Sequence, residues 1–302
     1  MDNFSTHPLY KIHTIDSAIN SLGKFYSKNF LILFITSFVI SLGMQLLTLT
    51  FNFRELMTIT DPLEMLDKLR GMILPFVAVS LVSLLLTCIL HYYVIYNPID
   101  SSVNIFTAAY RSLRYYLPYL IIMILFTFMA SFAMLLGLIA LIIGILFAAV
   151  YVVTLYLFIL PILMVEGPHI GNALSRTFTL VHRNFWSNIG WVAIFIILLV
   201  VISILLSGIL LIPFAGKFFS ILTNPGEAAN AMNIYSNPIF IILSALVNSL
   251  YLPFLPIFAT ILYFNGKARE EDSGVVRSTG DEPDQVKAED LYAPPKPEDK
   301  AD

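Results

Sequence analysis

Long uncharged segments alternate with short polar segments along this chain. No Asp, Glu, Lys or Arg lies between Lys28 and Arg54, Arg70 and Asp100, Arg114 and Glu166, Arg183 and Lys217, or Glu227 and Lys267. A helix needs roughly 20 apolar residues to cross a bilayer core of about 30 Å. The uncharged segments therefore predict six membrane-spanning helices, at about 30–51, 72–96, 117–136, 138–165, 189–213 and 239–264.

The longest uncharged segment is long enough for two spans, and we expect a tight turn between them near Gly137. A membrane β-barrel would need short segments in which apolar and polar residues alternate. The run 138–146 is instead apolar on every face, and we interpret Gly137 and Gly144 as marks of a turn or of close helix packing. The pattern predicts an all-α integral membrane protein.

A short amphipathic pattern precedes an apolar segment three times, at Ile15–Phe30, Ile99–Tyr116 and Ile170–Trp186. Each copy ends in a basic residue and aromatic residues, and the second copy needs a one-residue insertion near 108–109. The spacing predicts helices that lie in the membrane interface with their apolar side down. The alternative is that every inner loop of a membrane protein tends to be basic and amphipathic.

The even-numbered spans also end alike, with Asn97-Pro98 and Gly167-Pro168 leading into the second and third amphipathic helices. The sequence thus predicts three parallel repeats of about 15–97, 99–166 and 170–266, each with an interfacial helix and a two-span hairpin. Outer loop 52–71 looks helical, with Pro62 in a first turn after Asp61.

Composition agrees with a polytopic membrane protein, because hydrophobic residues make up 58% of the chain and charged residues 12%. Soluble domains carry about 25% charged residues. The single Cys88 excludes an intramolecular disulfide or a cysteine metal cluster, and residues 1–29 lack the form of a secretory signal. We expect a transmembrane domain at 1–271 and a disordered, acidic, proline-rich cytoplasmic tail at 272–302.

The distribution of basic residues predicts the orientation. With the N-terminus inside, nine basic residues lie on inner segments (Lys11, Lys24, Lys28, Arg111, Arg114, Arg176, Arg183, Lys267 and Arg269). Four lie on outer segments (Arg54, Lys68, Arg70 and Lys217). Cytoplasmic loops carry the excess of Lys and Arg. An even number of spans places both ends on one side, so both termini are predicted to be cytoplasmic.

Chemistry within the predicted spans is sparse. No predicted span holds an acid, Lys or Arg, which weighs against an ion-coupled carrier but leaves a passive pathway open. His91, near the inner end of the second span, is expected to be interfacial like Tyr92 and Tyr93 beside it rather than part of a proton relay. No zinc-protease, nucleophile-elbow or phosphate-loop motif occurs. The sequence predicts no enzymatic activity and no cofactor.

One polar cluster lies between the fourth and fifth predicted spans. It comprises Glu166, His169, Arg176, His182, Arg183, Asn184 and Trp186. Arg176 and Arg183, with the start of the amphipathic helix, could hold an anionic lipid headgroup or phosphate, and Glu166, His182 and Trp186 complete this candidate contact. The alternative is an ordinary positive-inside loop in which Glu166 pairs with a neighbouring base.

Four segments carry a resemblance: 161–167, 173–181, 183–186 and 262–271. They resemble a broad family of bacterial membrane proteins that includes the membrane domain attached to some glycerophosphodiester phosphodiesterases. The resemblance implies a six-span fold in a bacterial inner membrane. It implies no catalysis, because the phosphodiesterase activity of such proteins resides in a separate soluble domain.

Two function classes follow from these observations. The first is a non-enzymatic scaffold or accessory subunit that engages membrane lipids or protein partners, but no nucleic acid, through its inner-face helices and tail. The alternative is a passive channel or a lipid-handling protein whose three units surround a path.

Overall fold

A computed structural model describes residues 4–48, 59, 61–139, 141–216 and 237–272. Within these ranges every regular element is helical. The elements are η1 (Phe4–Thr6), α1 (Ile15–Lys28), α2 (Phe30–Thr48), α4 (Pro62–Tyr96), α5 (Ile105–Ile139), α6 (Leu141–Glu166), α7 (Ile170–Arg183), α8 (Phe185–Leu211), η2 (Ile212–Phe214), α11 (Pro238–Tyr251) and α12 (Phe254–Asp272). Of the expected tail, only Asp272 lies inside the described residues, as the last residue of α12.

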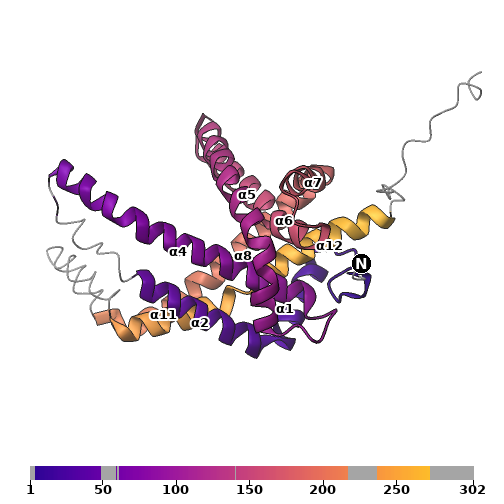
Figure 1. Cartoon of the computed structure of the whole chain (residues 1–302), viewed down its shortest axis with the longest axis horizontal. Coiled ribbons are helices and arrows are strands. Elements are labelled where there is room, and N and C mark those ends of the chain that lie inside the picture. The colour runs from indigo at the N-terminus through magenta and orange to yellow at the C-terminus, as the bar shows by residue number, and fades with distance from the viewer. Residues whose placement is uncertain (1–3, 49–58, 60, 140, 217–236, 273–302) are drawn as a thin grey trace, which may run out of the picture.

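The helices extend away from a shared centre, with α5 beside α6 and α2 beside α11 (Figure 1). Five helical segments are long and apolar enough to cross a membrane: α4, α5, α6, α8 with η2, and α11 with α12. Helices α1 and α2 meet at a bend of 82° and supply a sixth if the bent pair forms one span. The prediction of an all-helical fold with helices long and apolar enough to span a membrane is confirmed within the described residues.

Two helices start with a side-chain cap followed by proline. Asp61 caps α4 by accepting a hydrogen bond from the backbone N–H of Leu63 at 3.0 Å, with Pro62 in the first turn. Asn237 caps α11 in the same way, with Pro238 following it. A side-chain oxygen satisfies an otherwise unpaired N–H, and proline suits the first helical position because it lacks one.

The hairpin between α5 and α6 turns close to the predicted position. Leu141, the first residue of α6, takes a positive φ of 58°. Gly137 lies so close to the opposite helix that a Cβ there would be 2.8 Å from the carbonyl oxygen of Gly144. Small residues allow such close backbone contact between membrane helices.

We expect Gly137→Ala to destabilise the protein by about 1–3 kcal/mol, because the added methyl group overpacks a backbone contact that cannot yield like a flexible side chain. Thermal unfolding of the purified protein in detergent measures the loss. Gly208→Ala in α8 is the matched control, because no atom lies within 4 Å of the added Cβ position. Equal melting temperatures for the two variants would contradict the close packing.

The second amphipathic segment differs from its prediction. Its helix begins at Ile105 rather than Ile99, and it continues without a break through the expected span to Ile139. By contrast, α1 ends at Lys28 and α7 at Arg183, and Asn29 and Asn184 cap them. The side chain of Asn29 donates to the carbonyl of Phe25 at 2.9 Å. At the same distance from the start of the helix, where α1 and α7 have asparagine after a base, α5 has Tyr119 after Pro118, so it lacks the residue that follows the other two helices.

The apolar faces of these helices also differ from expectation, because they pack against the bundle. Ala18, Ala108 and Ala173 are at most 1% exposed. Helix α1 contacts α12, α5 contacts α4, and α7 contacts α6. Alanine leaves room for a neighbouring helix to approach, so protein rather than lipid covers this part of each predicted interfacial face.

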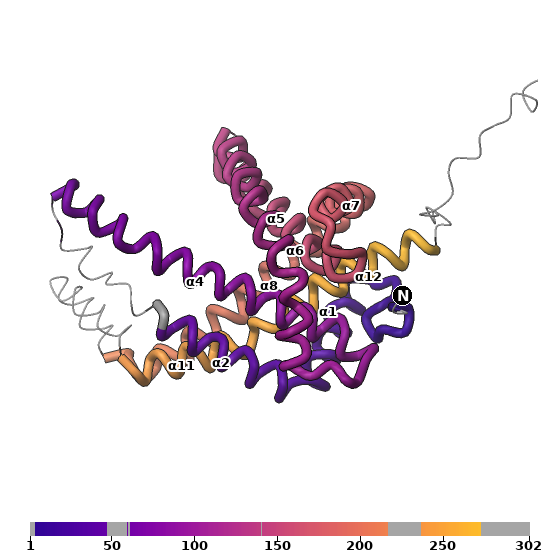
Figure 2. The backbone as a smooth tube through the Cα atoms, viewed as in Figure 1, coloured from indigo at the N-terminus to yellow at the C-terminus, as the bar shows by residue number. Residues whose placement is uncertain are grey.

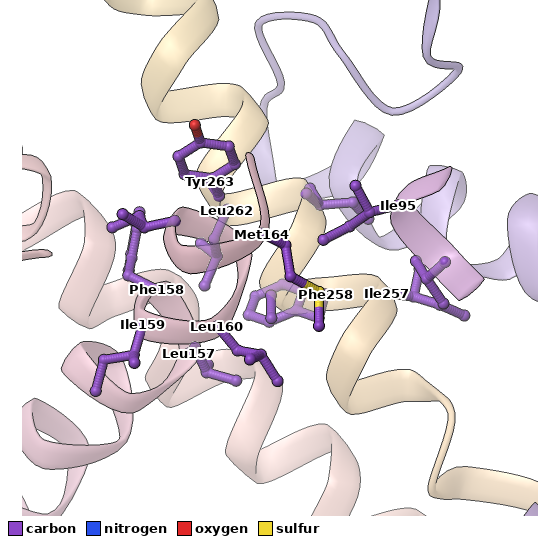
Figure 3. Packing of buried hydrophobic residues seen from close by; sticks show 14 of the residues in the cluster. Ile95, Leu157, Phe158, Ile159, Leu160, Met164, Ile257, Phe258, Leu262 and Tyr263 are labelled. Atoms are coloured by element: carbon purple, nitrogen blue, oxygen red, sulfur yellow. The ribbon is translucent and has the colours of Figure 1, made fainter. Parts of the chain in front are cut away.

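The densest packing lies where the C-terminal half of α4, α6 and α12 meet. Ile95, Leu160 and Leu262 are fully or almost fully buried there (Figure 3). The rings of Phe195 and Phe258 stack with centroids 3.9 Å apart. Only 11% to 33% of the most apolar 18-residue window of each of the five candidate spans is buried. Most of the surface of the spans therefore faces outward.

Candidate functional site

The predicted polar cluster forms an ion-pair network around Arg176. Its Nε donates to Oε1 of Glu166 at 3.1 Å, and its two terminal nitrogens donate to the two carboxylate oxygens of Glu270. Arg176 lies on α7, Glu166 ends α6, and Glu270 lies on α12, so three helices meet at one guanidinium. The three side chains are 22%, 17% and 13% exposed, respectively.

Two further residues complete the network. Arg183 contacts Oε1 of Glu270 at 3.1 Å, and the hydroxyl of Tyr263 donates to Oε1 of Glu166 at 3.0 Å. Partial burial opposes the charge of Arg176, but hydrogen bonds to Glu270 and the charge of Glu166 outweigh it and raise the pKa of the guanidinium. Both arginines thus contact carboxylates, and an anionic headgroup would have to compete with Glu270.

The turn between α6 and α7 positions this network. Gly167 takes φ +111°, a conformation that L side chains rarely adopt, and the chain enters α7 through His169. This turn reverses the chain, so that Arg176 on α7 lies within hydrogen-bonding distance of Glu166 at the end of α6. Pairing of Glu166 with a neighbouring base was one of the two interpretations of the loop, and the contact is present.

His182 and Trp186 lie apart from the network, in an aromatic cluster. Nε2 of His182 is 3.3 Å from the hydroxyl of Tyr151, and its ring stacks on Phe185. Trp186 is 75% exposed and packs against Phe147 and Phe185. The predicted site therefore divides into an ionic part and an aromatic part.

Sequence reasoning missed Glu270 and Tyr263, which lie 94 and 97 residues from their partners. One signal could have found Glu270. It follows the last span as part of the acidic pair Glu270-Glu271, although the positive-inside rule favours bases there.

The N-terminal segment 4–14 packs against the same end of the bundle, beside α12 (Figure 2). The backbone N–H of Leu9 donates to Nδ1 of His7 at 3.1 Å, so the proton lies on Nε2, which donates to the carbonyl of Val94 at 3.1 Å. The ring also packs on Phe264, with centroids 4.9 Å apart. Burial lowers the pKa of His7 to about 4, so the ring is neutral at pH 7.

A second contact joins this segment to α12. The backbone N–H of His13 donates to Oδ1 of Asn265 at 2.9 Å, and Arg269 donates to the carbonyl of His13 at 3.2 Å. These bonds connect residues more than 250 positions apart in the chain. The start and the end of the described bundle are therefore held together by hydrogen bonds.

A cavity of about 390 Å³ lies between α2, α4, α8, α11 and α12. Its lining is mainly aliphatic, and among the described residues that line it none is charged. The polar side chains at its wall are Ser41, Gln45, Ser83, Thr87, His91, Asn248 and Tyr251. Ligand sites in proteins have this size and this character, with a few polar groups in an apolar wall.

His91 lies at this wall rather than at the expected interface, and it is 3% exposed. Nδ1 is 2.9 Å from the carbonyl of Thr87, so it carries the proton, and Nε2 is the free acceptor of the neutral ring. Nε2 has no hydrogen-bond partner among the described residues. Ser41 is 5% exposed at the same wall, and Asn248 accepts from Tyr251 at 2.6 Å, which leaves its NH₂ group available. Within the described ranges, no cluster of His, Cys, Asp and Glu suits a metal ion.

No family model, curated protein or solved structure matches this chain.

Proposed function

We propose that this chain is a non-enzymatic integral membrane protein that takes a lipid-like molecule from the bilayer into the cavity beside His91. The observation that carries the proposal is a cavity of about 390 Å³ whose described lining is uncharged and comes from candidate spans. The lining residues 40–45 follow the start of α2 by 10–15 residues, about 15–22 Å along a helix that rises 1.5 Å per residue. A bilayer core of about 30 Å places the cavity within the hydrocarbon.

The membrane arrangement is part of the proposal. We place the protein in a bacterial inner membrane, as the resemblance implies, with both termini in the cytoplasm. The network around Arg176 and the segment containing His7 then lie at the cytoplasmic ends of the spans. Basic residues of α1, α5 and α7 support this orientation.

Three repeats remain part of the proposal, in a new register. The three helices begin directly after Thr14, Asn104 and His169. In all three copies, the fourth residue of the helix is a buried alanine. This register needs no insertion in the second copy. The helices α5 and α7 each contact the second span of the preceding repeat, α4 and α6. Helix α1 of the first repeat contacts α12, the second span of the third repeat.

A scaffold or accessory role is the second candidate. The inner ends of α4, α6 and α12 are joined by Arg176 and by the N-terminal segment. Such cross-linking supports a rigid surface on which a cytoplasmic or membrane partner could dock.

Filling the cavity tests the function. We expect the purified protein to retain a lipid that organic extraction and mass spectrometry identify, and Leu199→Trp to remove most of it, because Leu199 lines the cavity. Val200→Trp is the control, because its side chain is 49% exposed and does not line the cavity. Retention of the same lipids by both variants, with co-purification of a stable protein partner, would favour the scaffold.

A separate experiment tests the orientation. In a Cys88→Ala background, Leu63→Cys places a thiol on the first turns of α4, where the side chain is 72% exposed. We expect a membrane-impermeant maleimide to label it in intact cells, because the start of α4 lies outside in the proposed topology. Labelling only after the cells are opened would reverse the orientation.

A further inference from the structure

We propose that the cavity selects an uncharged amphiphile with a hydroxyl group, which donates its proton to Nε2 of His91 while the chain occupies the apolar wall. This inference rests on the proposed function and names the chemical class of its ligand. It assigns the recognition to His91, Ser41 and Asn248, which come from three different helices.

The absence of charge in the lining excludes ionic ligands on energetic grounds. Among the described residues at the wall there is no Asp, Glu, Lys or Arg. Transfer of an unpaired ion into an apolar site costs several kcal/mol even after relaxation. A carboxylate, a phosphate or an ammonium group would find no counter-ion in this cavity, so the ligand is neutral.

The tautomer of His91 determines which neutral group fits. Because Nδ1 donates to the carbonyl of Thr87, Nε2 can only accept. A hydroxyl group in the cavity can donate to this acceptor and so form a hydrogen bond that the apolar wall does not offer. Ser41 and the NH₂ group of Asn248 can donate to a hydroxyl oxygen. An ether or ester offers only acceptors and would leave Nε2 unpaired.

Water alone is a poor occupant of the whole space. About a dozen water molecules at roughly 30 Å³ each would be needed to fill it. The aliphatic wall formed by Leu86, Leu90, Leu199 and Leu255 offers them no hydrogen bonds. A hydrocarbon chain matches that part of the wall, and a volume of about 390 Å³ suits the head and adjoining segment of one chain.

Photolabelling with three probes tests the inference on the full-length protein in phosphatidylcholine vesicles. The probes are diazirine derivatives of hexadecan-1-ol, hexadecanoic acid and hexadecane. We expect the alcohol to label peptides of α2, α4 and α11 most strongly, and excess hexadecan-1-ol to compete. His91→Phe and Asn248→Leu should each reduce this labelling about 5–10-fold, the equivalent of one hydrogen bond. Thr127→Val on α5, away from the cavity, should leave it unchanged.

The outcomes separate this inference from the proposed function. Equal labelling of the cavity by alcohol and alkane, unaffected by His91→Phe or by Asn248→Leu, would overturn the hydroxyl selection but keep a lipid-binding cavity. Stronger labelling by the acid would overturn the neutral class. Labelling of the cavity peptides no higher than that of outward-facing α5 peptides would overturn both. Size-exclusion profiles identify any variant that fails to fold. If either His91→Phe or Asn248→Leu does so, the labelling of the other variant decides whether the cavity selects a hydroxyl group.

Discussion

Replacing Arg176 with methionine is expected to destabilise the protein by about 3 kcal/mol, the lower end of the loss found when one partner of a buried ion pair is removed. The variant keeps an apolar stem but leaves Glu166 and Glu270 without the guanidinium that bridges them. The low end applies because the side chains remain 13% to 22% exposed. Thermal or denaturant unfolding in detergent measures the loss.

The chain contains a matched control for this substitution. Arg111 pairs with Asp100 at 3.4 Å, but their side chains are 48% and 44% exposed. Arg111→Met should therefore cost much less stability than Arg176→Met, because solvent screens an exposed ion pair. In the double variant Arg176→Met with Glu166→Gln, part of the stability should return, because the carboxylate that loses its cation is removed while Glu270 keeps its contact with Arg183. Similar losses for Arg176→Met and Arg111→Met would contradict a structural role for the network.

Acidification should release the N-terminal segment. His7 has a pKa of about 4 in the folded protein and 6.5 when the segment is free, so the free segment binds more protons between these values. The stability of docking is fully present above pH 6.5, and it is lost as the pH falls toward 4. At about 1.4 kcal/mol per pKa unit, the total loss is on the order of 3 kcal/mol.

The melting temperature between pH 7.5 and 4.5 checks this expectation, with His7→Gln as the comparison. Glutamine can still donate to the carbonyl of Val94 but does not titrate. Burial also lowers the pKa of His13, so both proteins retain some pH dependence, and the difference between them isolates His7. If the melting temperatures of the two proteins fell by the same amount over this pH range, His7 would contribute nothing to the pH dependence of stability.

Local features of the fold were predictable because they depend on residues close in sequence. Uncharged length predicted the spans, and small residues predicted the close turn at Gly137. Asp61 and Pro62 predicted where α4 begins. The break between an amphipathic helix and its span also has a local signal, because Asn29 and Asn184 each follow a basic residue at this break. The second copy lacks such an asparagine, so its amphipathic segment continues into the span.

The candidate sites were less predictable because each depends on which helices become neighbours. Nothing near Arg176 in sequence indicates that Glu270 will bind it. His91 looked interfacial because Tyr92 and Tyr93 adjoin it, but the packing of α2 and α11 beside α4 encloses it. A uniformly apolar span does not show which of its faces will line a cavity, so Ser41 and Asn248 had no distinguishing pattern.

The hydrogen bonds between His13 and α12 can form only after α12 has been synthesised. The partner side chain, Asn265, is 252 residues further along the chain. At roughly 5–20 residues per second, a ribosome needs about 10–50 s to reach it. During that interval the nascent N-terminal segment has no docking surface from α12, although the segments that follow are already entering the bilayer. Helix α12 therefore completes the site that the segment 4–14 occupies, and a chain truncated before α12 would leave that segment without this partner.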